Sequence, residues 1–310
     1  MPLDRRIRRV PKCGDPGGAG ESSNMIRCRE IEIADLDAIA DLLANGFPVR
    51  PRDYWIDGLR RLAVRETPGS FPRFGYMLEH DRTPVGALLL IHTARCDGGH
   101  ISIRCNLSSW YVEPAYRSYA PMMTKVAQRH KDVTYVNISP AQWTWDAIEA
   151  QGFRRYCAGL FFSFPAVSRP AKDMRVEVVR QDTRAIDGLS NSDAVLLARH
   201  AFYGCLVLVC RAADGRAFPF VLQPMRLGRV SLPSMQMIYC ADVADYIACA
   251  GTLGRFLIRR GWISVALDAN GPVTGLVGIY REPIGRKYFK GPHCPRLADL
   301  SDSELVIYGP

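Results

Sequence analysis

One segment of the sequence combines the residue types that could hold a phosphate group. Residues 110–123 read WYVEPAYRSYAPMM, in which strand-forming residues lead through Pro114 and Arg117 into a run of small and apolar residues. The first N–H groups of a helix have no partner within the helix, and the aligned peptide dipoles place partial positive charge there. Arg117 adds a full positive charge on the turn. The segment therefore predicts a strand, a turn and a helix that together suit a pyrophosphate.

Alternating strands and amphipathic helices surround this segment. Apolar residues spaced three and four apart, such as Leu36, Ile39 and Leu43, predict a helix that Asp35 begins and Gly46 ends. The same reasoning along residues 25–165 predicts strand 26–33, helices 35–46 and 50–65, strands 74–79, 84–93 and 101–112, helix 118–130, strand 133–138, helix 144–151 and strand 156–164.

The second half of the chain loosely repeats this plan. Residues 165–172 (PAVSRPAK) are rich in proline and polar, which is typical of a linker. We therefore expect a tail at 1–24, a first domain at 25–165, a linker at 166–172 and a second domain at 173–310. Within the second domain we predict strand 175–179, helix 193–202, strands 206–211, 216–222 and 235–240, helix 243–260, and strands 263–267 and 304–308.

The turn and the order of elements resemble those of the GNAT superfamily of acyl-CoA N-acyltransferases. That family's turn often reads V-x-P-x-Y-R-G-x-G-x-G, and four residues match it here: Val112, Pro114, Tyr116 and Arg117. The family's segment ending in Gly-Phe corresponds to residues 147–153 (AIEAQGF). The resemblance covers about residues 25–165, and the whole chain is also similar to a bacterial group with two tandem GNAT-like halves. It implies an α/β fold with mixed sheets, in two tandem GNAT-like domains.

The resemblance also implies a site for acetyl-CoA or another acyl-CoA in the first half. The residues that it assigns to cofactor binding are Tyr111, Val112, Arg117, Ser118, Tyr119, Ala120 and Met122. Ser118, Ala120 and Met122 stand where the family usually has glycine. Ala120 is a mild change because backbone amides make the cradle, whereas Met122 adds bulk where the pyrophosphate should rest. The second half has no comparable turn, so we expect no cofactor site of its own there.

The catalytic groups follow less directly from the resemblance. The family often has a tyrosine on the helix before Gly-Phe, and Ile148 stands there instead. The polar residues at the ends of the two central strands are Ser108, Asn137 and Ser139, and we predict them as the catalytic candidates. They could orient water or the pantetheine amide, while proximity supplies much of the rate. Alternatively, Asn137 and Ser139 cap the short helix after Pro140.

A basic and aromatic group of residues lies near the end of the chain. Arg281, Arg286, Lys287 and Lys290 bracket Tyr288-Phe289. The group is predicted either to bind an anionic acceptor or to form an exposed loop beside a strand.

Composition limits the remaining classes. Of 310 residues, 48% are hydrophobic and 23% charged, which is typical of globular domains. No apolar run reaches the roughly 20 residues of a membrane span. The ten cysteines form no C-x-x-C pair and the six histidines are scattered, so we expect free thiols, a cytoplasmic protein and no metal site. The net charge of +9 comes from residues spread along the chain, and it suits a phosphorylated cofactor as well as a nucleic acid.

The sequence thus predicts an acyl-CoA-dependent N-acyltransferase that acts on a small-molecule or peptide amine. Three alternatives stay open: a non-catalytic acyl-CoA sensor that has lost its activity, an aminoacyl-tRNA-dependent transferase with paired GNAT-like domains, and an enzyme that O-acylates a sugar. Only the tRNA alternative requires a nucleic-acid partner, and none requires a membrane.

Overall fold

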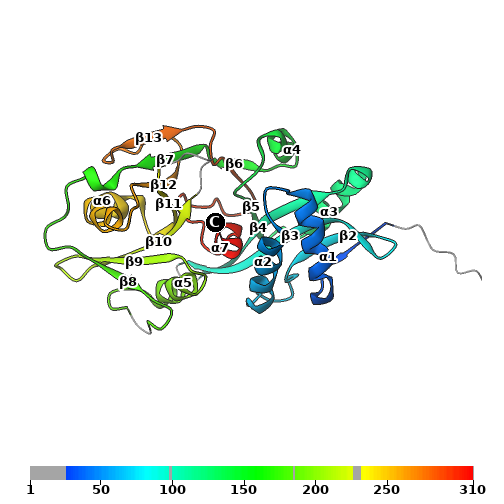
Figure 1. The fold of residues 1–310 in the computed structure, drawn as a ribbon, viewed down its shortest axis with the longest axis horizontal. Coiled ribbons are helices and arrows are strands. Elements are labelled where there is room, and N and C mark those ends of the chain that lie inside the picture. Colours follow the sequence, from blue (N-terminus) through cyan, green and yellow to red (C-terminus); the bar gives the residue numbers. More distant parts are fainter. Residues whose placement is uncertain (1–25, 98–99, 184–185, 226–231, 310) are drawn as a thin grey trace, which may run out of the picture.

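Two mixed β-sheets of seven strands each, lying side by side, form the body of the molecule in the computed structural model (Figure 1). The structure describes residues 26–97, 100–183, 186–225 and 232–309, so the predicted tail at 1–24 lies outside it. Sheet A has the strand order β1-β2-β3-β4-β5-β14-β6, and sheet B has the order β13-β7-β12-β11-β10-β9-β8. Two mixed sheets with helices on their faces confirm the predicted α/β class in two tandem halves.

Sheet A carries helices on both faces. Its strands are β1 (Arg27–Glu30), β2 (Gly75–His80), β3 (Thr83–Asp97), β4 (His100–Val112), β5 (Val133–Asn137), β14 (Lys287–Lys290) and β6 (Arg154–Cys157). One face packs against α1 (Leu36–Gly46), α2 (Arg52–Val64) and the C-terminal α7 (Glu304–Tyr308). The other face packs against α3 (Ala120–Ala127) and α4 (Trp145–Ala150). Short 3₁₀ turns lie at Ile33–Asp35, Pro114–Tyr119, Gln142–Thr144 and Pro165–Val167.

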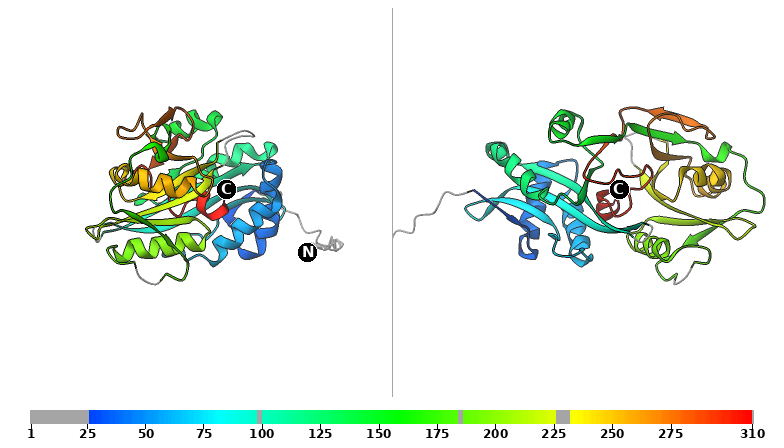
Figure 2. Two further views of the ribbon diagram at one scale, coloured as in Figure 1. Left: turned by 60° about the vertical axis from the view of Figure 1, so that its left-hand side comes forward. Right: turned by 180° about the vertical axis from the view of Figure 1, so that it is seen from behind.

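Sheet B is likewise covered on both faces (Figure 2). Its strands are β7 (Gly159–Ser163), β8 (Arg175–Val179), β9 (Leu206–Arg211), β10 (Ala217–Met225), β11 (Ser234–Cys240), β12 (Ser264–Ala269) and β13 (Gly278–Arg281). Helix α6 (Val243–Ile258) packs on one face through Tyr246, Leu253 and Leu257. Helix α5 (Asn191–Phe202) packs on the other through Leu196 and Leu197.

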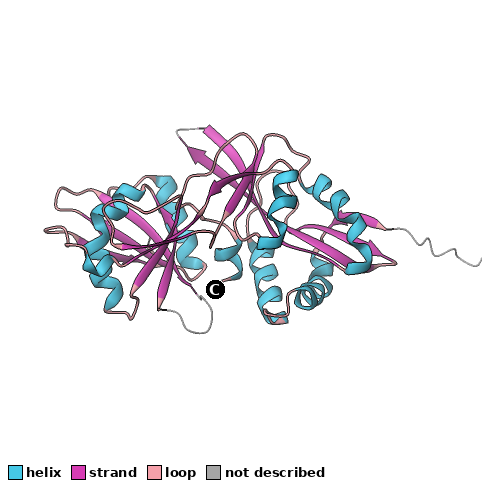
Figure 3. Ribbon diagram, turned by 90° about the horizontal axis from the view of Figure 1, so that it is seen from above, coloured by secondary structure: helices cyan, strands magenta, loops and turns pink. Residues whose placement is uncertain are grey.

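The two halves exchange elements across the segment predicted as a linker. β7 precedes residues 166–172 yet belongs to sheet B, and β14 follows them yet lies between β5 and β6 in sheet A. Helix α7 also returns to the first half and lies between the two sheets (Figures 1 and 3). Each sheet therefore contains a strand from the other half of the sequence, in addition to the chain segment that connects the halves.

The single strand predicted at 156–164 is wrong, because it is two strands in different sheets. β6 ends at Cys157 and β7 begins at Gly159. The Asn270 side chain fixes the bend between them: its Oδ1 accepts from the Ala158 N–H at 2.7 Å, and its Nδ2 donates to the Tyr156 carbonyl at 3.1 Å. A residue from a distant turn thus decides where this run of strand-forming residues breaks.

The strand predicted at 304–308 is also wrong, because these residues form helix α7. ELVIY is a short apolar run, which periodicity alone does not assign to strand or helix. Its contacts select the helix. Ile307 and Tyr308 are buried against α1 and α2, and Gly58 of α2 leaves the space for the Tyr308 ring.

The basic and aromatic group predicted near the end of the chain is largely part of sheet A rather than an exposed patch. Lys287 is 3% exposed, and its Nζ lies 2.7 Å from the Asp268 carboxylate, which is also buried. Tyr288 is fully buried between β5 and β6. Among the described residues, no helix is long and apolar enough to cross a membrane.

Candidate functional site

The two central strands of sheet A separate at the position where the sequence predicts the site. β4 and β5 run parallel and pair from Ile103 with Val133 to Asn106 with Val136. Beyond Asn106, β4 continues to Val112 with β3 as its pairing partner, while β5 ends at Asn137. The strands therefore leave a gap between the second half of β4 and the end of β5.

A bulge in β4 lies beside this gap. Leu89 of β3 pairs with Ser108, whereas Ala87, two residues earlier, pairs with Tyr111, so β4 contains one extra residue. Ser109 takes up the extra length with φ of 51°, a conformation that non-glycine residues rarely adopt. Strained residues and bulges of this kind recur beside active sites, where they redirect the backbone.

A cavity of about 720 Å³ passes through the gap from one face of sheet A to the other. On the α3–α4 face it is lined by Thr124, Gln128, Ile148, Gln151 and Phe153. On the opposite face its lining comes from the α1–α2 loop, from α7 and from sheet B. A ligand could therefore enter along α3 and reach a second ligand on the far side of the sheet.

A buried carboxyl group lies in this cavity. Glu304, the first residue of α7, is 7% exposed and lines the cavity. The Ser139 hydroxyl donates a short hydrogen bond to the Glu304 Oε1. The backbone N–H of Glu304 donates to the Asn106 Oδ1 at 2.8 Å. Burial raises the pKa of Glu304 above its usual value, although the hydroxyls of Ser108 and Ser139 act in the opposite direction. The protonated form of Glu304 is thus favoured relative to that of an exposed carboxyl group.

The structure places the three predicted catalytic residues in the lining of this cavity. Ser108 and Ser139 both contact Glu304, and Asn137 lines the same cavity at the end of β5. Ser108 is also linked to Ser109 of the bulge, with 2.9 Å between the two hydroxyl oxygens. The Ser139 hydroxyl is used by Glu304, and the N-cap residues of the helical segment after Pro140, Ala141 and Thr144, make no side-chain cap of their own.

The predicted cofactor residues lie beside the cavity rather than in its lining. Arg117, Ser118, Tyr119 and Met122 are exposed around the start of α3. Val112 is buried in the core, while Tyr111 and Ala120 are half-buried. Thr124, which does line the cavity, lies one turn after Ala120 on the same side of α3. The first turn of α3 therefore lies next to the cavity, whereas Tyr111 packs beside Phe47 on the α1–α2 face of sheet A.

The first turns of α3 and α6 differ in whether a side chain caps their backbone N–H groups, which decides whether an anion can bind there. Neither Glu113 nor Tyr119 caps its helix with a side chain, and Met122 is 38% exposed while its neighbour Met123 fills the core. In the second half, the Asp242 carboxylate accepts from the Ala244 N–H at 2.8 Å and caps α6. A negative charge already at a helix start competes with a phosphate for the same amides.

The gap of sheet B is occupied by the chain itself. β11 and β12 pair only from Ser234 to Gln236, as β4 and β5 do over a short stretch. Beyond that point residues 296–304, here called the C-terminal strap, run along β11. The Cys240 N–H donates to the Ala298 carbonyl at 3.1 Å, and the Leu300 N–H to the Ile238 carbonyl at 2.7 Å. The strap thus fills the position that in sheet A belongs to the cavity.

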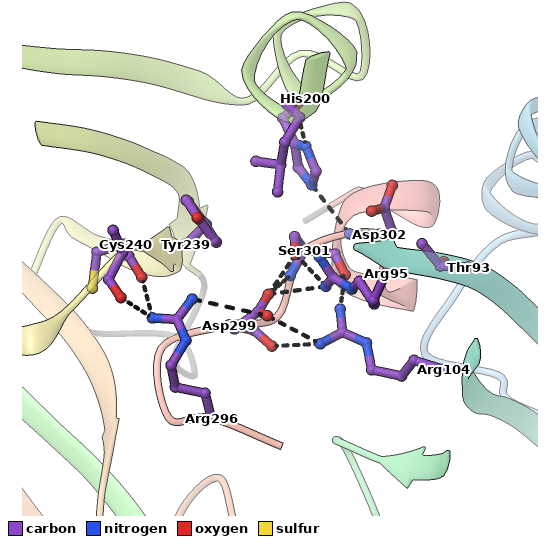
Figure 4. Close-up of polar contacts among 12 residues, drawn as sticks. Thr93, Arg95, Arg104, His200, Tyr239, Cys240, Arg296, Asp299, Ser301 and Asp302 are labelled. Atoms are coloured by element: carbon purple, nitrogen blue, oxygen red, sulfur yellow. Dashed lines mark hydrogen bonds and ion pairs between the residues drawn. The ribbon is translucent and has the colours of Figure 1, made fainter. Parts of the chain in front are cut away.

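Charged residues from both halves hold the C-terminal strap (Figure 4). Arg95 and Arg104, which extend from β3 and β4, contact the Asp299 carboxylate at 3.0 and 3.3 Å. Asp302 is fully buried, with its carboxylate 2.7 Å from the Arg199 guanidinium and its N–H donating to the His200 Nε2 at 3.1 Å.

The ion pairs of Asp299 and Asp302, here called the clamp, hold the C-terminal strap, and the strap ends at Glu304. Burial alone would raise the pKa of Asp302, but the surrounding guanidinium groups and His200 hold it below the usual value. The carboxylate therefore stays charged at neutral pH and keeps its contacts. The clamp fixes where Glu304 enters the cavity.

Among the described residues no group of three or more histidine, cysteine or acidic side chains could hold a metal ion. The eight cysteines described are all free thiols.

Sequence reasoning missed Glu304. It lies 165 residues from Ser139 and 198 from Asn106 along the chain. The apolar run that follows it indicated a strand, and no motif marks the carboxyl group as part of the site. The only signal in the sequence was an acidic residue at the start of that run.

Comparison with known proteins shows the fold. No protein-family model and no curated protein matches the chain. Among solved structures, the GCN5-related N-acetyltransferase from Kribbella flavida matches with a TM-score of 0.55 and 12% identity, covering 86% of this chain and 70% of its own. The one from Anabaena variabilis matches at 0.55 and 9% identity, covering 86% and 72%. A conserved protein of unknown function from Enterococcus faecalis matches at 0.55 and 11% identity, covering 90% and 74%. The chain therefore has the GNAT fold, as the sequence predicts.

Proposed function

We propose that the protein is an acyl-CoA-dependent N-acyltransferase that uses one active site, in the first half of the chain. The observation that carries this proposal is the cavity that crosses sheet A at the gap between β4 and β5, with a buried carboxyl group inside it. The acetyltransferases with the same fold support the reaction class.

Acetyl-CoA or another acyl-CoA fits the α3 side of this site. The start of α3 has no side-chain cap, and Arg117 beside it is exposed and makes no ion pair among the described residues. These groups would hold the phosphates, and the gap would receive the pantetheine, with Thr124 and Gln128 along its side. Bound there, acyl-CoA supplies the thioester whose carbonyl carbon the amine attacks.

Glu304 is proposed as the base. As a carboxylate it would take a proton from the neutral acceptor amine while the C–N bond forms and the C–S bond breaks. It would then pass that proton to the departing sulfur, so that CoA leaves as its thiol. Ser108 and Ser139 would orient the carboxylate through their hydroxyls, and Asn106 would hold the backbone of Glu304 in place. In this assignment Ser108, Asn137 and Ser139 are positioning residues, since the proton transfer belongs to Glu304.

The second half is proposed to shape the acceptor side rather than to bind a second cofactor. Gln223, Met225 and Ile238 of sheet B line the same cavity. The C-terminal strap along β11 and the Asp242 cap on α6 support this division of labour.

The direct test is release of free thiol from acetyl-CoA in the presence of a panel of primary amines. Turnover with any amine supports the enzyme, and mass spectrometry should find the acylated amine. Binding of CoA without turnover would favour the sensor alternative. Absence of both would refute the proposal and leave the aminoacyl-tRNA-dependent transferase to be tried with charged tRNA.

A further inference from the structure

The acceptor side of the cavity is walled by aromatic rings. Phe47, Tyr54, Trp55 and Tyr308 all line it. Their ring centroids lie 5.4 Å apart for Phe47 and Trp55, 5.1 Å for Tyr54 and Trp55, and 6.0 Å for Tyr54 and Tyr308. Pairs at these separations stabilise one another, so each ring of the wall is held in place by its neighbours. A ring of the ligand could add to this cluster.

Few charges face this space. Among the described residues that line the cavity, the charged ones are Arg50 and Glu304. The Arg50 guanidinium already packs over the Tyr54 ring, 4.4 Å from its centroid. A polyamine would need several carboxylates, and a phosphorylated acceptor a group of basic residues. The lining instead suits an acceptor whose one charge is its amine, next to Glu304.

A buried amide group from sheet B also faces the cavity. Gln223 is 6% exposed and lines the cavity, and its Oε1 has no hydrogen-bond partner among the described residues. Gln236, its cross-strand neighbour, donates its own Nε2 to the Met237 carbonyl at 3.4 Å. Buried amide oxygens are nearly always paired, so an unpaired one in a cavity indicates a donor supplied by a ligand.

We propose that the acceptor is a hydroxylated arylalkylamine: a primary amine on a short chain from an aromatic ring that carries a hydroxyl group. This inference rests on the proposed function and names its substrate class. The ring lies against Phe47, Tyr54 and Trp55, the amine reaches Glu304, and the hydroxyl donates to the Gln223 Oε1. During transfer the neutral amine loses a proton to Glu304 as the C–N bond forms and the C–S bond of the thioester breaks. Glu304 then gives that proton to the departing sulfur, so that CoA leaves as its thiol.

The test compares tyramine with phenylethylamine, which lacks only the hydroxyl group. With saturating acetyl-CoA, we expect kcat/KM for tyramine to exceed that for phenylethylamine by about tenfold, because phenylethylamine leaves the Gln223 oxygen unpaired. In the Gln223→Leu variant the ratio should fall to about one, with the KM for acetyl-CoA unchanged. The matched control is Gln181→Leu, which alters an exposed glutamine outside the cavity and should keep the wild-type ratio.

Three results would overturn the inference. The first is an equal kcat/KM for the two amines in the wild type, and the second is a higher kcat/KM for spermidine or glucosamine than for tyramine. The third is a higher kcat/KM with long-chain acyl-CoA than with acetyl-CoA, because the aromatic wall would then bind the acyl chain. If other amines are acylated, the proposed function survives these results. If no amine is acylated, quenching of tryptophan fluorescence on titration with each amine gives the same comparison. Equal quenching by tyramine and phenylethylamine would then overturn the inference on its own.

Discussion

Replacing Glu304 with glutamine separates its proposed role as a base from its role in packing. Glutamine has the same length and keeps an oxygen that can accept from Ser139, and the backbone N–H to Asn106 is unaffected. Loss of a general base costs typically 10²–10⁴-fold in rate, or about 3–5 kcal/mol of transition-state stabilisation. We therefore expect kcat of Glu304→Gln to fall by about 10²–10⁴-fold, with little change in the KM for acetyl-CoA.

The pH profile gives a second and independent readout. Because burial raises the pKa of Glu304, the active carboxylate forms only above the usual carboxyl range of about 4, and wild-type kcat/KM should rise with pH through that raised pKa. This acid limb should be absent from Glu304→Gln. The raised pKa also means that the folded protein binds the proton more tightly than the unfolded chain. The stability contributed by the protonated form is present at low pH and is lost as the pH rises through the folded pKa.

Glutamine therefore should not lower the melting temperature at pH 8, which excludes unfolding as the cause of lost activity. The assay is free-thiol release with a saturating amine from pH 5 to 9, with thermal melts of the same samples. Glu66→Gln, which changes an exposed carboxylate away from the cavity, is the matched control. The reasoning is refuted if Glu304→Gln keeps more than a tenth of the wild-type kcat, or if its acid limb matches that of the wild type.

Three further substitutions test other parts of the structure. Arg117→Ala should weaken CoA binding by about 1–3 kcal/mol, or about fivefold to 150-fold by calorimetry, because a charge-assisted contact to phosphate is lost. Gly58→Ala should lower stability by about 1–3 kcal/mol in urea unfolding, because the new Cβ would lie 1.9 Å from the Tyr308 Cδ1, although alanine favours helices by about 1 kcal/mol. Asp302→Asn should lower stability by about 3 kcal/mol at pH 7, because it leaves the Arg199 charge without its buried partner. Since the folded pKa of Asp302 is depressed, its contribution is present above the unfolded pKa of about 4, and the difference from wild type should shrink as the pH falls through the folded pKa.

Each of these has its own control. Arg60→Ala removes an exposed arginine of α2 and should leave CoA affinity unchanged; an Arg117→Ala affinity equal to that of the wild type would contradict the phosphate assignment. Gly271→Ala adds a methyl group in open space and should leave the free energy of unfolding unchanged. A higher free energy of unfolding for Gly58→Ala would show that the Tyr308 ring does not need the space beside Gly58. A difference between wild type and Asp302→Asn that stays constant from pH 7 to pH 3 would argue against the ion pair.

The sequence predicted the first half well because its signals are local. The helix over Leu36–Gly46 follows from apolar spacing and its end residues, and β5 follows from a buried run that Pro140 terminates. The gap between β4 and β5 followed from the resemblance to the GNAT turn around Arg117, which is also contained in one short segment.

The parts that the sequence did not predict depend on contacts across long separations. Asn270 breaks the run of residues 156–164 from more than one hundred positions away, and Gly58 leaves the space in which Tyr308 of α7 packs. Glu304 joins Ser108 and Ser139 only because the C-terminal strap is clamped between the halves. No local pattern contains that information, so the proposed base could be found only once the chain was folded.

The stoichiometry of CoA binding tests the central claim most directly. Among the described residues both sheets have a gap between two parallel strands, but the C-terminal strap fills the gap of sheet B, whereas the gap of sheet A leads to a cavity. Isothermal titration of the full chain with CoA should give one site per chain, and that site should be weakened in Arg117→Ala. Two equivalent sites per chain would contradict the occupied gap in sheet B, and no binding at all would contradict the assignment of the cavity between β4 and β5 to acyl-CoA.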